Sequence, residues 1–393
     1  MKTPAILGAK PLLDQQVYIT RPVLPDKDRF FDAIRDIFER GWLTNSGPYV
    51  NRLEEKLREY LGVEHCQVFT NGTLSLQLMV QGLRLAGDVI TTPFTFPATV
   101  HTLYWNHIIP QFCDVDPETY NITPEAIEAA ITPNTTGIMP VHVYGNPCEV
   151  DRIQDVASKY GLKVCYDAAH AFGVKIGGRP IGTFGDANSF SFHATKLYNT
   201  MEGGAMTTRD ANLAWRVQMY RNFGIKNEEE VIGPGINAKM HELQGAYGLL
   251  VLERIDEEIE ARRRIARRYD EALAELPGLR MQRVREDVER TYQYYTIRIV
   301  PEEYGVTRDQ LHRALKAEGI VTRKYFYPLC STYACYASLP SAAPGRLPNA
   351  EKLAQSILCL PMFGQMEDRI VDVVIEALQS IHYHAPRVRK ELG

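Results

Sequence analysis

One lysine in this sequence stands where its amine would be desolvated. Lys196 ends the run Ser191–Lys196 (SFHATK) behind a nearly all-apolar strand, and no other charged residue follows until Glu202. Burial disfavours the protonated amine, so its pKa falls and it can attack an aldehyde near neutral pH. An isolated lysine is usually a solvated surface group. The next glycines, Gly203 and Gly204, let backbone pass close to a ligand and favour the reactive interpretation.

A carboxylate and a histidine end a second apolar strand, in the run Tyr166–His170 (YDAAH). Asp167 either caps the next helix or pairs with a cation such as a protonated pyridine nitrogen, which would offset the cost of burying the carboxylate. Such a pair keeps the ring an electron sink. His170 lies on the same turn, where it contacts the phenolic oxygen of that ring or is a hydrogen-bonded core histidine.

Two further runs at strand ends have the composition of a cofactor site. Thr70–Ser75 (TNGTLS) joins a strand to an apolar helix, and a glycine at such a helix start exposes N–H groups to a phosphate. The run lacks the lysine of a P-loop, so it suits one small phosphate. In Thr92–Thr99 (TPFTFPAT), Phe96 is the candidate to cover one face of a planar ring, although an aromatic residue there more often belongs to the core.

Each run has a structural explanation by itself, but their order along the chain resembles that of the DegT/StrS sugar-nucleotide aminotransferases. These enzymes have fold type I of the proteins that use pyridoxal 5'-phosphate (PLP), and the similarity extends from about Gly41 to Gly248. It implies that Lys196 is the Schiff-base lysine and that Asp167 pairs with the pyridine nitrogen. The other implied cofactor ligands are Phe96 at the ring face, His170 at the phenolic oxygen, and Gly72, Thr73 and Ser191 at the phosphate.

The run Gly235–Met240 (GINAKM) is similar to the family's G-x-N-x-R/K-M turn, whose asparagine reaches the phosphate in the neighbouring subunit. Asn237 therefore implies a homodimer with shared active sites. The run Gly41–Pro48 (GWLTNSGP) fits an early loop of the family. Relatives with histidine in place of the lysine catalyse deoxygenation, so Lys196 favours amino transfer.

The similarity also implies the substrates: a nucleotide-linked keto sugar, and L-glutamate as the amino donor that leaves as 2-oxoglutarate. Residues 110–173 look most like enzymes that aminate C4 of dTDP-4-keto-6-deoxyglucose, and relatives that aminate C3 of a dTDP-3-keto-6-deoxyhexose share most of these motifs. A PLP-binding regulatory protein without turnover is the alternative of another class. The presence of the lysine, and the lack of a helix-turn-helix before the motifs, argue against it.

The run Arg323–Pro328 (RKYFYP) resembles the segment that lines the nucleotide-sugar cleft of the family. An arginine or lysine there would meet a phosphate, and aromatic residues would stack on the substrate. Ordinary aromatic packing of a small domain explains the run equally well. The implied substrate contacts are Arg323, Lys324, Tyr325 and Tyr327.

The elements that position these residues follow from hydrophobic spacing. Residues 26–40 have apolar side chains at helical intervals and end at Gly41. Short apolar runs then alternate with helical stretches, which predicts an α/β fold with a mostly parallel, seven-stranded sheet covered on both faces. The predicted strands are His65–Thr70, Val89–Thr92, Pro110–Asp114, Gly137–Val143, Lys163–Asp167, Asn188–Phe192 and Ala205–Thr208. Ligands of such sheets bind beyond the carboxyl ends of the strands, where the motifs lie.

A different set of elements follows Met240. We predict one long amphipathic helix to about Leu276, a strand over Tyr292–Val300, a helix over Thr307–Ala317 and an irregular stretch rich in Tyr and Pro. The chain then has three parts: an extended N-terminal segment (1–25), a large PLP-binding domain (26–260) and a smaller C-terminal α+β domain (261–393).

Composition narrows the classes of function. The 393 residues are 45% apolar and 23% charged, with a formal net charge of -4, and the absence of a basic stripe argues against nucleic-acid binding. The seven cysteines are scattered without a C-x-x-C pair or a histidine cluster, so we expect buried thiols and no metal site. Without a signal sequence or a long apolar run, we expect a cytoplasmic protein that does not enter the membrane.

Overall fold

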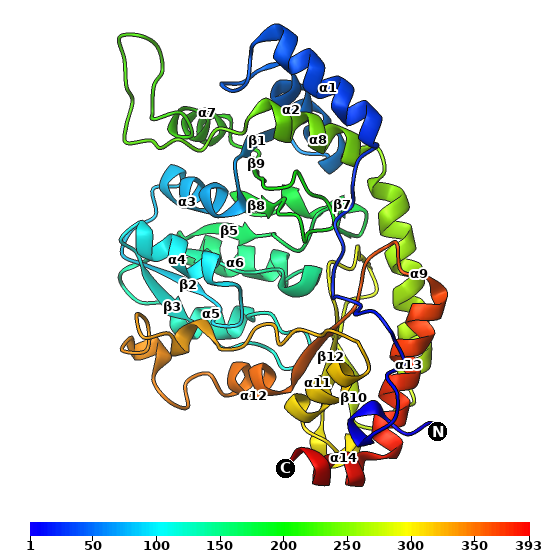
Figure 1. Cartoon of the computed structure of the whole chain (residues 1–393). Coiled ribbons are helices and arrows are strands. Elements are labelled where there is room, and N and C mark those ends of the chain that lie inside the picture. The colour runs from blue at the N-terminus through cyan, green and yellow to red at the C-terminus, as the bar shows by residue number, and fades with distance from the viewer.

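A seven-stranded sheet forms the centre of the larger part of the molecule (Figure 1). The computed structural model describes residues 1–393. The strand order is β1-β9-β8-β5-β4-β2-β3, and β9 alone runs against its neighbours. The strands are β1 (His65–Phe69), β2 (Asp88–Thr91), β3 (Ile109–Phe112), β4 (Thr135–Met139), β5 (Lys163–Asp167), β8 (Ala187–Ser191) and β9 (Gly204–Thr208). The seven predicted strands and their mostly parallel arrangement are confirmed.

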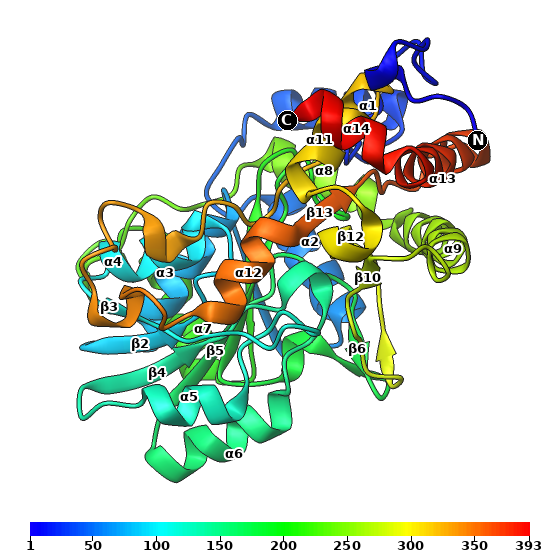
Figure 2. The same ribbon diagram turned by 90° about the horizontal axis from the view of Figure 1, so that it is seen from below.

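Helices cover both faces of this sheet, because successive residues of each strand point to opposite sides and both sides are apolar (Figures 1 and 2). In β1, Val68 and Phe69 are both fully buried but pack in different cores. The core on the Phe69 side includes α3 (Gly72–Gly82), α4 (Pro97–Trp105) and α7 (Ala211–Tyr220). The core on the Val68 side includes α2 (Pro48–Leu61), α5 (Pro124–Ala130), α6 (Val150–Tyr160) and α8 (Glu242–Leu252).

The prediction of one long helix over residues 240–276 is wrong, because the chain forms two helices there. The first is α8, and the second is α9 (Ile255–Leu273), with Glu253 and Arg254 between them. The apolar pattern changes at this point: α8 is apolar on nearly all sides and packs against α2 and α1 (Lys27–Arg40), whereas α9 is amphipathic. The helix predicted over residues 26–40 is confirmed as α1, with Asp26 as its N-cap.

A smaller three-stranded antiparallel sheet organises the C-terminal part of the chain (Figure 1). Its elements are β10 (Leu279–Met281), β12 (Tyr295–Ile299), β13 (Ile357–Leu360), α10 (Pro301–Tyr304), α11 (Arg308–Ala317), α13 (Asp368–Tyr383) and α14 (Ala385–Leu392). The strand and helix predicted here are confirmed as β12 and α11. Along α9, Ile259 packs in the core of the larger part and Ile265 in the core of the smaller part. The domain boundaries at residues 25 and 260 stay predictions.

The N-terminal segment lies across both parts, which Figure 1 shows as the blue chain. The main chain of Val17 pairs with Ile320, at the smaller part. Further along, the Val23 carbonyl accepts hydrogen bonds from the side chains of Asn199 and Tyr247, in the larger part. The segment is therefore fixed to both parts.

The Tyr- and Pro-rich stretch after α11 leaves the smaller part and packs on the surface of the larger part. The Cys330 N–H donates to the Pro93 carbonyl at 3.1 Å, and the Tyr336 hydroxyl is 2.7 Å from Nδ1 of His101. The stretch ends in α12 (Pro348–Ser356). A third small sheet of two-residue strands also connects the parts: β6 (Lys175–Ile176), β7 (Arg179–Pro180) and β11 (Val288–Glu289).

Candidate active site

The predicted motifs meet at the carboxyl edge of the central sheet. Asn71 follows β1, Phe96 follows β2, Asp167 ends β5, and Lys196 follows β8. Because β5 and β8 are neighbours in the sheet, Asp167 and Lys196 come from adjacent strands. Doubly wound sheets bind their ligands at this edge.

Lys196 lies in the loop between β8 and β9, and its side chain is half-buried. Burial lowers the pKa of its amine to about 8, and the nearby Asp167 carboxylate opposes this shift. Its Nζ atom lies 5.8 Å from the centre of the Tyr294 ring, which the smaller part contributes. An appreciable fraction of the amine is therefore neutral near neutral pH, as a nucleophile or a base requires.

Asp167 is buried, with 4% of its surface exposed. Its Oδ2 atom accepts a hydrogen bond from the Thr99 hydroxyl at 2.7 Å, and its Oδ1 atom accepts the Ala169 N–H at 3.0 Å. Burial raises the pKa of this carboxyl even though both hydrogen bonds and Lys196 oppose the shift. A buried carboxylate with hydrogen bonds but no salt bridge fits the charged nitrogen of a pyridinium ring.

His170 is buried as a neutral donor. Its Nδ1 atom accepts the Tyr144 N–H at 3.3 Å, so the ring proton is on Nε2. Burial lowers the pKa of the imidazole well below its ordinary value, and Lys196 lowers it further. The ring stacks on Phe326 at 5.8 Å between centroids. A neutral Nε2–H fits a phenolic oxygen as acceptor, and this contact stays a prediction.

The loop after β1 presents free N–H groups at the start of α3. The Asn71 side chain accepts the Leu74 N–H at 2.9 Å, and the N–H groups of Gly72 and Thr73 have no partner within the chain. A side chain on Gly72 would lie 2.9 Å from Cβ of Ser191, so glycine is what allows Ser191 to come this close. Two free N–H groups, a hydroxyl and a helix N-terminus fit a phosphate.

Gly204, one of the two glycines after Lys196, packs against the phosphate loop. A side chain on Gly204 would lie 2.7 Å from Cα of Gly72 and 2.8 Å from the carbonyl carbon of Asn71. Gly204 therefore lets β9 approach the phosphate loop. Its small size serves this close packing of the chain, and the approach of a ligand to it stays a prediction.

The other two predicted cofactor contacts, Phe96 and Asn237, are exposed. Phe96 precedes α4 with 52% of its surface exposed. Asn237 precedes Ala238, whose carbonyl accepts the Thr70 N–H at 3.1 Å, so this turn also lies beside the phosphate loop of its own chain. The ring contact of Phe96 and the subunit that Asn237 serves stay predictions.

Tyr325 is the predicted substrate residue that contacts Tyr294, the aromatic residue beside Lys196. Its ring packs edge-on against Tyr294 at 5.6 Å, and its carbonyl accepts a hydrogen bond from the Tyr144 hydroxyl. The Arg323 guanidinium lies 5.3 Å from the centre of the Tyr325 ring. Tyr294 therefore lies between Lys196 and Tyr325, and Arg323 lies on the far side of Tyr325.

Lys324 and Tyr327 instead face α11. The Lys324 amine forms a 2.6 Å ion pair with Asp309, so its charge already has a partner. Tyr327 is 56% exposed, with the Arg308 guanidinium 5.2 Å from its ring centre. Their part in substrate binding stays a prediction.

Several residues of the site were missed by the sequence reasoning. The hydroxyls of Thr95 and Thr99 are 2.8 Å apart, and Thr99 supports Asp167. Both belong to the TPFTFPAT run, where two threonines four residues apart on a helix start were the available signal. Tyr144, Tyr294 and Phe326 reach the site from far along the chain, and no local pattern marks them.

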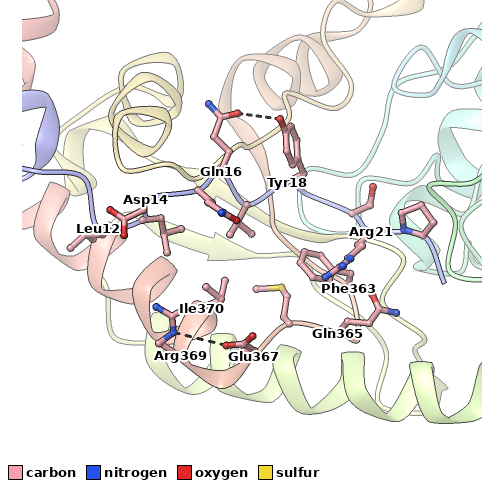
Figure 3. A pocket seen from close by; sticks show the side chains of 16 residues that line it. Leu12, Asp14, Gln16, Tyr18, Arg21, Phe363, Gln365, Glu367, Arg369 and Ile370 are labelled. Atoms are coloured by element: carbon pink, nitrogen blue, oxygen red, sulfur yellow. Dashed lines mark hydrogen bonds and ion pairs between the residues drawn. The ribbon is translucent and has the colours of Figure 1, made fainter. Parts of the chain in front are cut away.

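A surface hollow of about 760 Å³ lies elsewhere, between the N-terminal segment and the loop before α13 (Figure 3). Two pairs of its polar side chains lie against each other: the Tyr18 hydroxyl donates to Gln16, and Arg369 lies beside Glu367. These groups do not converge on a point, so the hollow lacks the arrangement expected of a catalytic site.

No group of His, Cys, Asp and Glu side chains is arranged to hold a metal ion, and no helix combines the length and apolar character needed to cross a membrane.

Comparison with known proteins gives three consistent findings. A sequence profile described as the DegT/DnrJ/EryC1/StrS aminotransferase family matches residues 25–379. The chain is 41% identical to dTDP-4-amino-4,6-dideoxy-D-glucose transaminase of Escherichia coli over 366 residues, which are 93% of this chain and 98% of that protein. It is 34% identical to GDP-perosamine synthase of Caulobacter vibrioides, covering 93% and 98%. The crystal structure of DesI in the presence of its TDP-sugar product superimposes with a TM-score of 0.92 at 38% identity, covering 98% of this chain and 97% of that one.

Proposed function

This chain belongs to the DegT/DnrJ/EryC1/StrS aminotransferase family, and from that premise we propose that it moves an amino group from L-glutamate to the C4 ketone of a nucleotide-linked sugar such as dTDP-4-keto-6-deoxyglucose. One observation carries the chemistry: a half-buried lysine whose pKa is about 8 and a buried carboxylate without a salt bridge stand at adjacent strand ends. The relatives support the substrate, because the name of the Escherichia coli protein gives a dTDP-linked 4-amino sugar and DesI was crystallised with its TDP-sugar product.

The cofactor of the family is PLP, which supplies an aldehyde that accepts the amino group and a cationic ring that takes up electrons. The residues described above fit this group. Lys196 would hold the aldehyde carbon and Asp167 the ring nitrogen. The other residues that would hold it are His170 at the phenolic oxygen, Phe96 at the ring face, and Gly72, Thr73 and Ser191 at the phosphate.

The chain's own residues supply the acid–base chemistry. Lys196 Nζ takes a proton from the carbon that carries the nitrogen and delivers it to the carbon on the other side of that nitrogen, a 1,3-shift, and its lowered pKa allows both steps near neutral pH. Asp167 remains charged as long as a cation faces it, which holds the positive charge on the ring nitrogen. The aromatic side chains of Tyr294 and Phe326 cover the site from the smaller part and exclude water.

The apolar surface of the chain supports a homodimer with shared active sites. Large apolar side chains are exposed on α1 and the loop after it, and again on the projecting loop between α7 and α8 (Figure 1). We expect a second copy of the chain to cover them, because large exposed apolar side chains are typical of protein–protein interfaces. They are Phe31, Phe38, Trp42, Leu43, Phe223, Ile225 and Val231. Asn237 follows the projecting loop, which is consistent with a contact to a second copy.

The product formed from each keto sugar tests the proposal. Purified protein with PLP and L-glutamate is supplied with dTDP-4-keto-6-deoxyglucose or with dTDP-3-keto-6-deoxyhexose, and NMR locates the new amino group. We expect amination at C4 together with release of 2-oxoglutarate. Amination at C3 alone would contradict the C4 assignment, and binding of PLP without turnover on any keto sugar or donor would favour a regulatory protein.

A further inference from the structure

The loop that carries Lys196 is held by one side chain from the smaller part. The Leu197 N–H donates to Oε1 of Gln293 at 2.7 Å, and Nε2 of Gln293 donates to the Thr195 carbonyl at 3.1 Å. Gln293 is buried, with 1% of its surface exposed. A primary amide presents a donor and an acceptor side by side, so it can pair with a backbone as a neighbouring strand would. The two bonds fall on the residues immediately before and after the lysine.

Gln293 is itself rigidly supported. Nη1 of Arg262 donates to the main-chain carbonyls of Gln293, at 3.3 Å, and Tyr292, at 3.1 Å. Arg262 is fully buried and forms a 2.7 Å ion pair with Glu258, which also accepts the Gly364 N–H. Gln293 is therefore anchored to α9 and, through Glu258, to the segment after β13.

The loop needs such support because its own structure is irregular. Residues 192–203, between β8 and β9, contain no helix or strand. A lysine side chain in a free loop would move toward water, where its amine is better solvated when charged. The residue next to Gln293 is Tyr294, whose ring lies 5.8 Å from Lys196 Nζ. Two consecutive residues therefore act on the lysine: Gln293 holds its backbone, and Tyr294 covers its amine.

We propose that Gln293 is a positioning residue for Lys196: its amide fixes the backbone on both sides of the lysine and so keeps the amine in the desolvated site. The proposal rests on the role of Lys196 in the proposed function. Gln293 acts through the lysine backbone and has no contact of its own with the reacting atoms. Misplacing a catalytic group by about 1 Å can cost on the order of 100-fold in rate.

The test compares Gln293→Met with Gln282→Met. Gln282 is a matched control: it is also buried, with 7% of its surface exposed, and its Nε2 donates to the carbonyls of Thr119 and Val143. Two quantities are measured on full-length protein. The first is kcat and KM of the PLP-loaded enzyme. The second is the pH dependence of Lys196 acetylation by acetic anhydride in PLP-free protein, read by peptide mass spectrometry.

We expect acetylation of wild-type Lys196 to have its midpoint near pH 8. In Gln293→Met the midpoint should rise by about one pH unit or more, toward that of a solvated lysine, and kcat should fall about 10- to 100-fold with little change in KM. Gln282→Met should leave both quantities near wild type. An unchanged midpoint in Gln293→Met, or equal changes in the two variants, would overturn the proposal.

Gln293→Glu serves if Gln293→Met does not fold. A protonated glutamic acid can replace both hydrogen bonds of the amide, whereas the carboxylate has no donor for the Thr195 carbonyl. Its kcat relative to wild type should therefore fall as the introduced carboxyl ionises, and a constant ratio across pH would contradict the proposal. The acetylation measurement needs no sugar, so a wild-type chain without transaminase activity would refute the proposed function and still leave the positioning of Lys196 decided.

Discussion

The Thr99 hydroxyl donates a 2.7 Å hydrogen bond to Asp167 Oδ2 inside the protein, and the Thr95 hydroxyl lies 2.8 Å from Thr99. This bond links the segment after β2 to the end of β5. It favours the charged form of a carboxyl whose pKa burial raises. Thr99 is thus part of what keeps Asp167 able to face a cation.

Removing the Thr99 hydroxyl should weaken catalysis through Asp167. Thr99→Val keeps the shape but deletes a hydrogen bond to a charged group, worth about 1.5–3 kcal/mol. We expect kcat to fall roughly 10- to 100-fold, with Thr99→Ser close to wild type. Thr102→Val is the control, because Thr102 lies on the same helix with a buried hydroxyl that has no partner. An equal fall of kcat in Thr99→Val and Thr102→Val would contradict a specific role of the Thr99 hydroxyl.

Asp167→Asn should lose activity but not stability in the absence of PLP. The asparagine cannot hold a charge on the ring nitrogen, so we expect kcat to fall on the order of 10²- to 10³-fold. In the absence of PLP, the same substitution should leave the stability of the protein unchanged or raise it. The folded-state pKa of Asp167 is raised, so folding takes up protons and wild-type stability falls as the pH rises from the unfolded pKa through the folded pKa.

At neutral pH, PLP-free Asp167→Asn should therefore unfold at the same temperature as wild type or higher, and the difference should shrink in acid. Adding PLP should raise the Tm of wild type more than that of the variant. Asp88→Asn is the comparison, because Asp88 is a buried carboxylate held by the hydroxyls of Thr132 and Thr135 away from this site. A lower Tm for PLP-free Asp167→Asn would mean that the carboxylate has a stabilising partner within the chain.

Lys196 should be the attachment point of the cofactor. Borohydride treatment of PLP-loaded protein should fix the cofactor to the peptide that contains Lys196, as peptide mass spectrometry can show. Lys196→Ala should lower kcat by about 10²- to 10⁴-fold, the range for losing a general base. Cofactor fixed to a different lysine would contradict the assignment.

Mixing two inactive chains should restore activity if the active sites are shared. Lys196→Ala and Asn237→Asp place their changes in different copies of the chain. A hybrid dimer then has one site free of both changes, provided that Asn237 serves the neighbouring subunit. We expect the mixture to regain part of the wild-type kcat once subunits exchange. Proven exchange without recovery would assign Asn237 to its own subunit or to no role.

Glu242 should be required for the stability of the larger part. Its buried carboxylate accepts the N–H groups of Tyr49 and Val50, both at 2.9 Å, at the start of α2. Glu242→Ala leaves both donors unsatisfied, and we expect the free energy of unfolding to fall by about 2 kcal/mol in urea denaturation. Gly47→Ala should also destabilise, because its Cβ would lie 2.7 Å from both carboxylate oxygens. Unchanged urea midpoints would contradict this arrangement.

The fold was predictable where burial leaves a continuous apolar run. Several strands of the central sheet, such as β5, have such a run, and the others are short β-rich runs between helical stretches, so all seven were found. The reversal of β9 was not predictable, because a strand covered on both faces has the same composition in either direction. β6, β7 and β11 have two residues each, too few to show a period. The break at Glu253 was hidden because helix-forming residues continue on both sides of it.

The site was predictable where its chemistry is local. Asp167 and Lys196 each follow an apolar strand, and the rule that sheets bind ligands at their carboxyl edge brings the two together. Gln293 gave no such signal. It stands two residues before β12 among tyrosines, and only the tertiary structure shows that its amide faces the lysine loop. The ion pair of Lys324 with Asp309 was likewise invisible, since a surface lysine and a phosphate ligand look alike in sequence.

Residues 2–12 form hydrogen bonds with residues that lie more than 300 positions later in the chain. The Lys2 carbonyl accepts a hydrogen bond from Ser380, and the N–H groups of Ala5 and Leu12 bind the Glu318 side chain. These partners are translated only after the whole central sheet. The smaller part therefore cannot fold in the order of synthesis, because residues 2–12 lack these partners until Glu318 and Ser380 have been translated. A chain that terminates early would keep its phosphate loop and lysine but expose the apolar surfaces that this segment and the last helices bury.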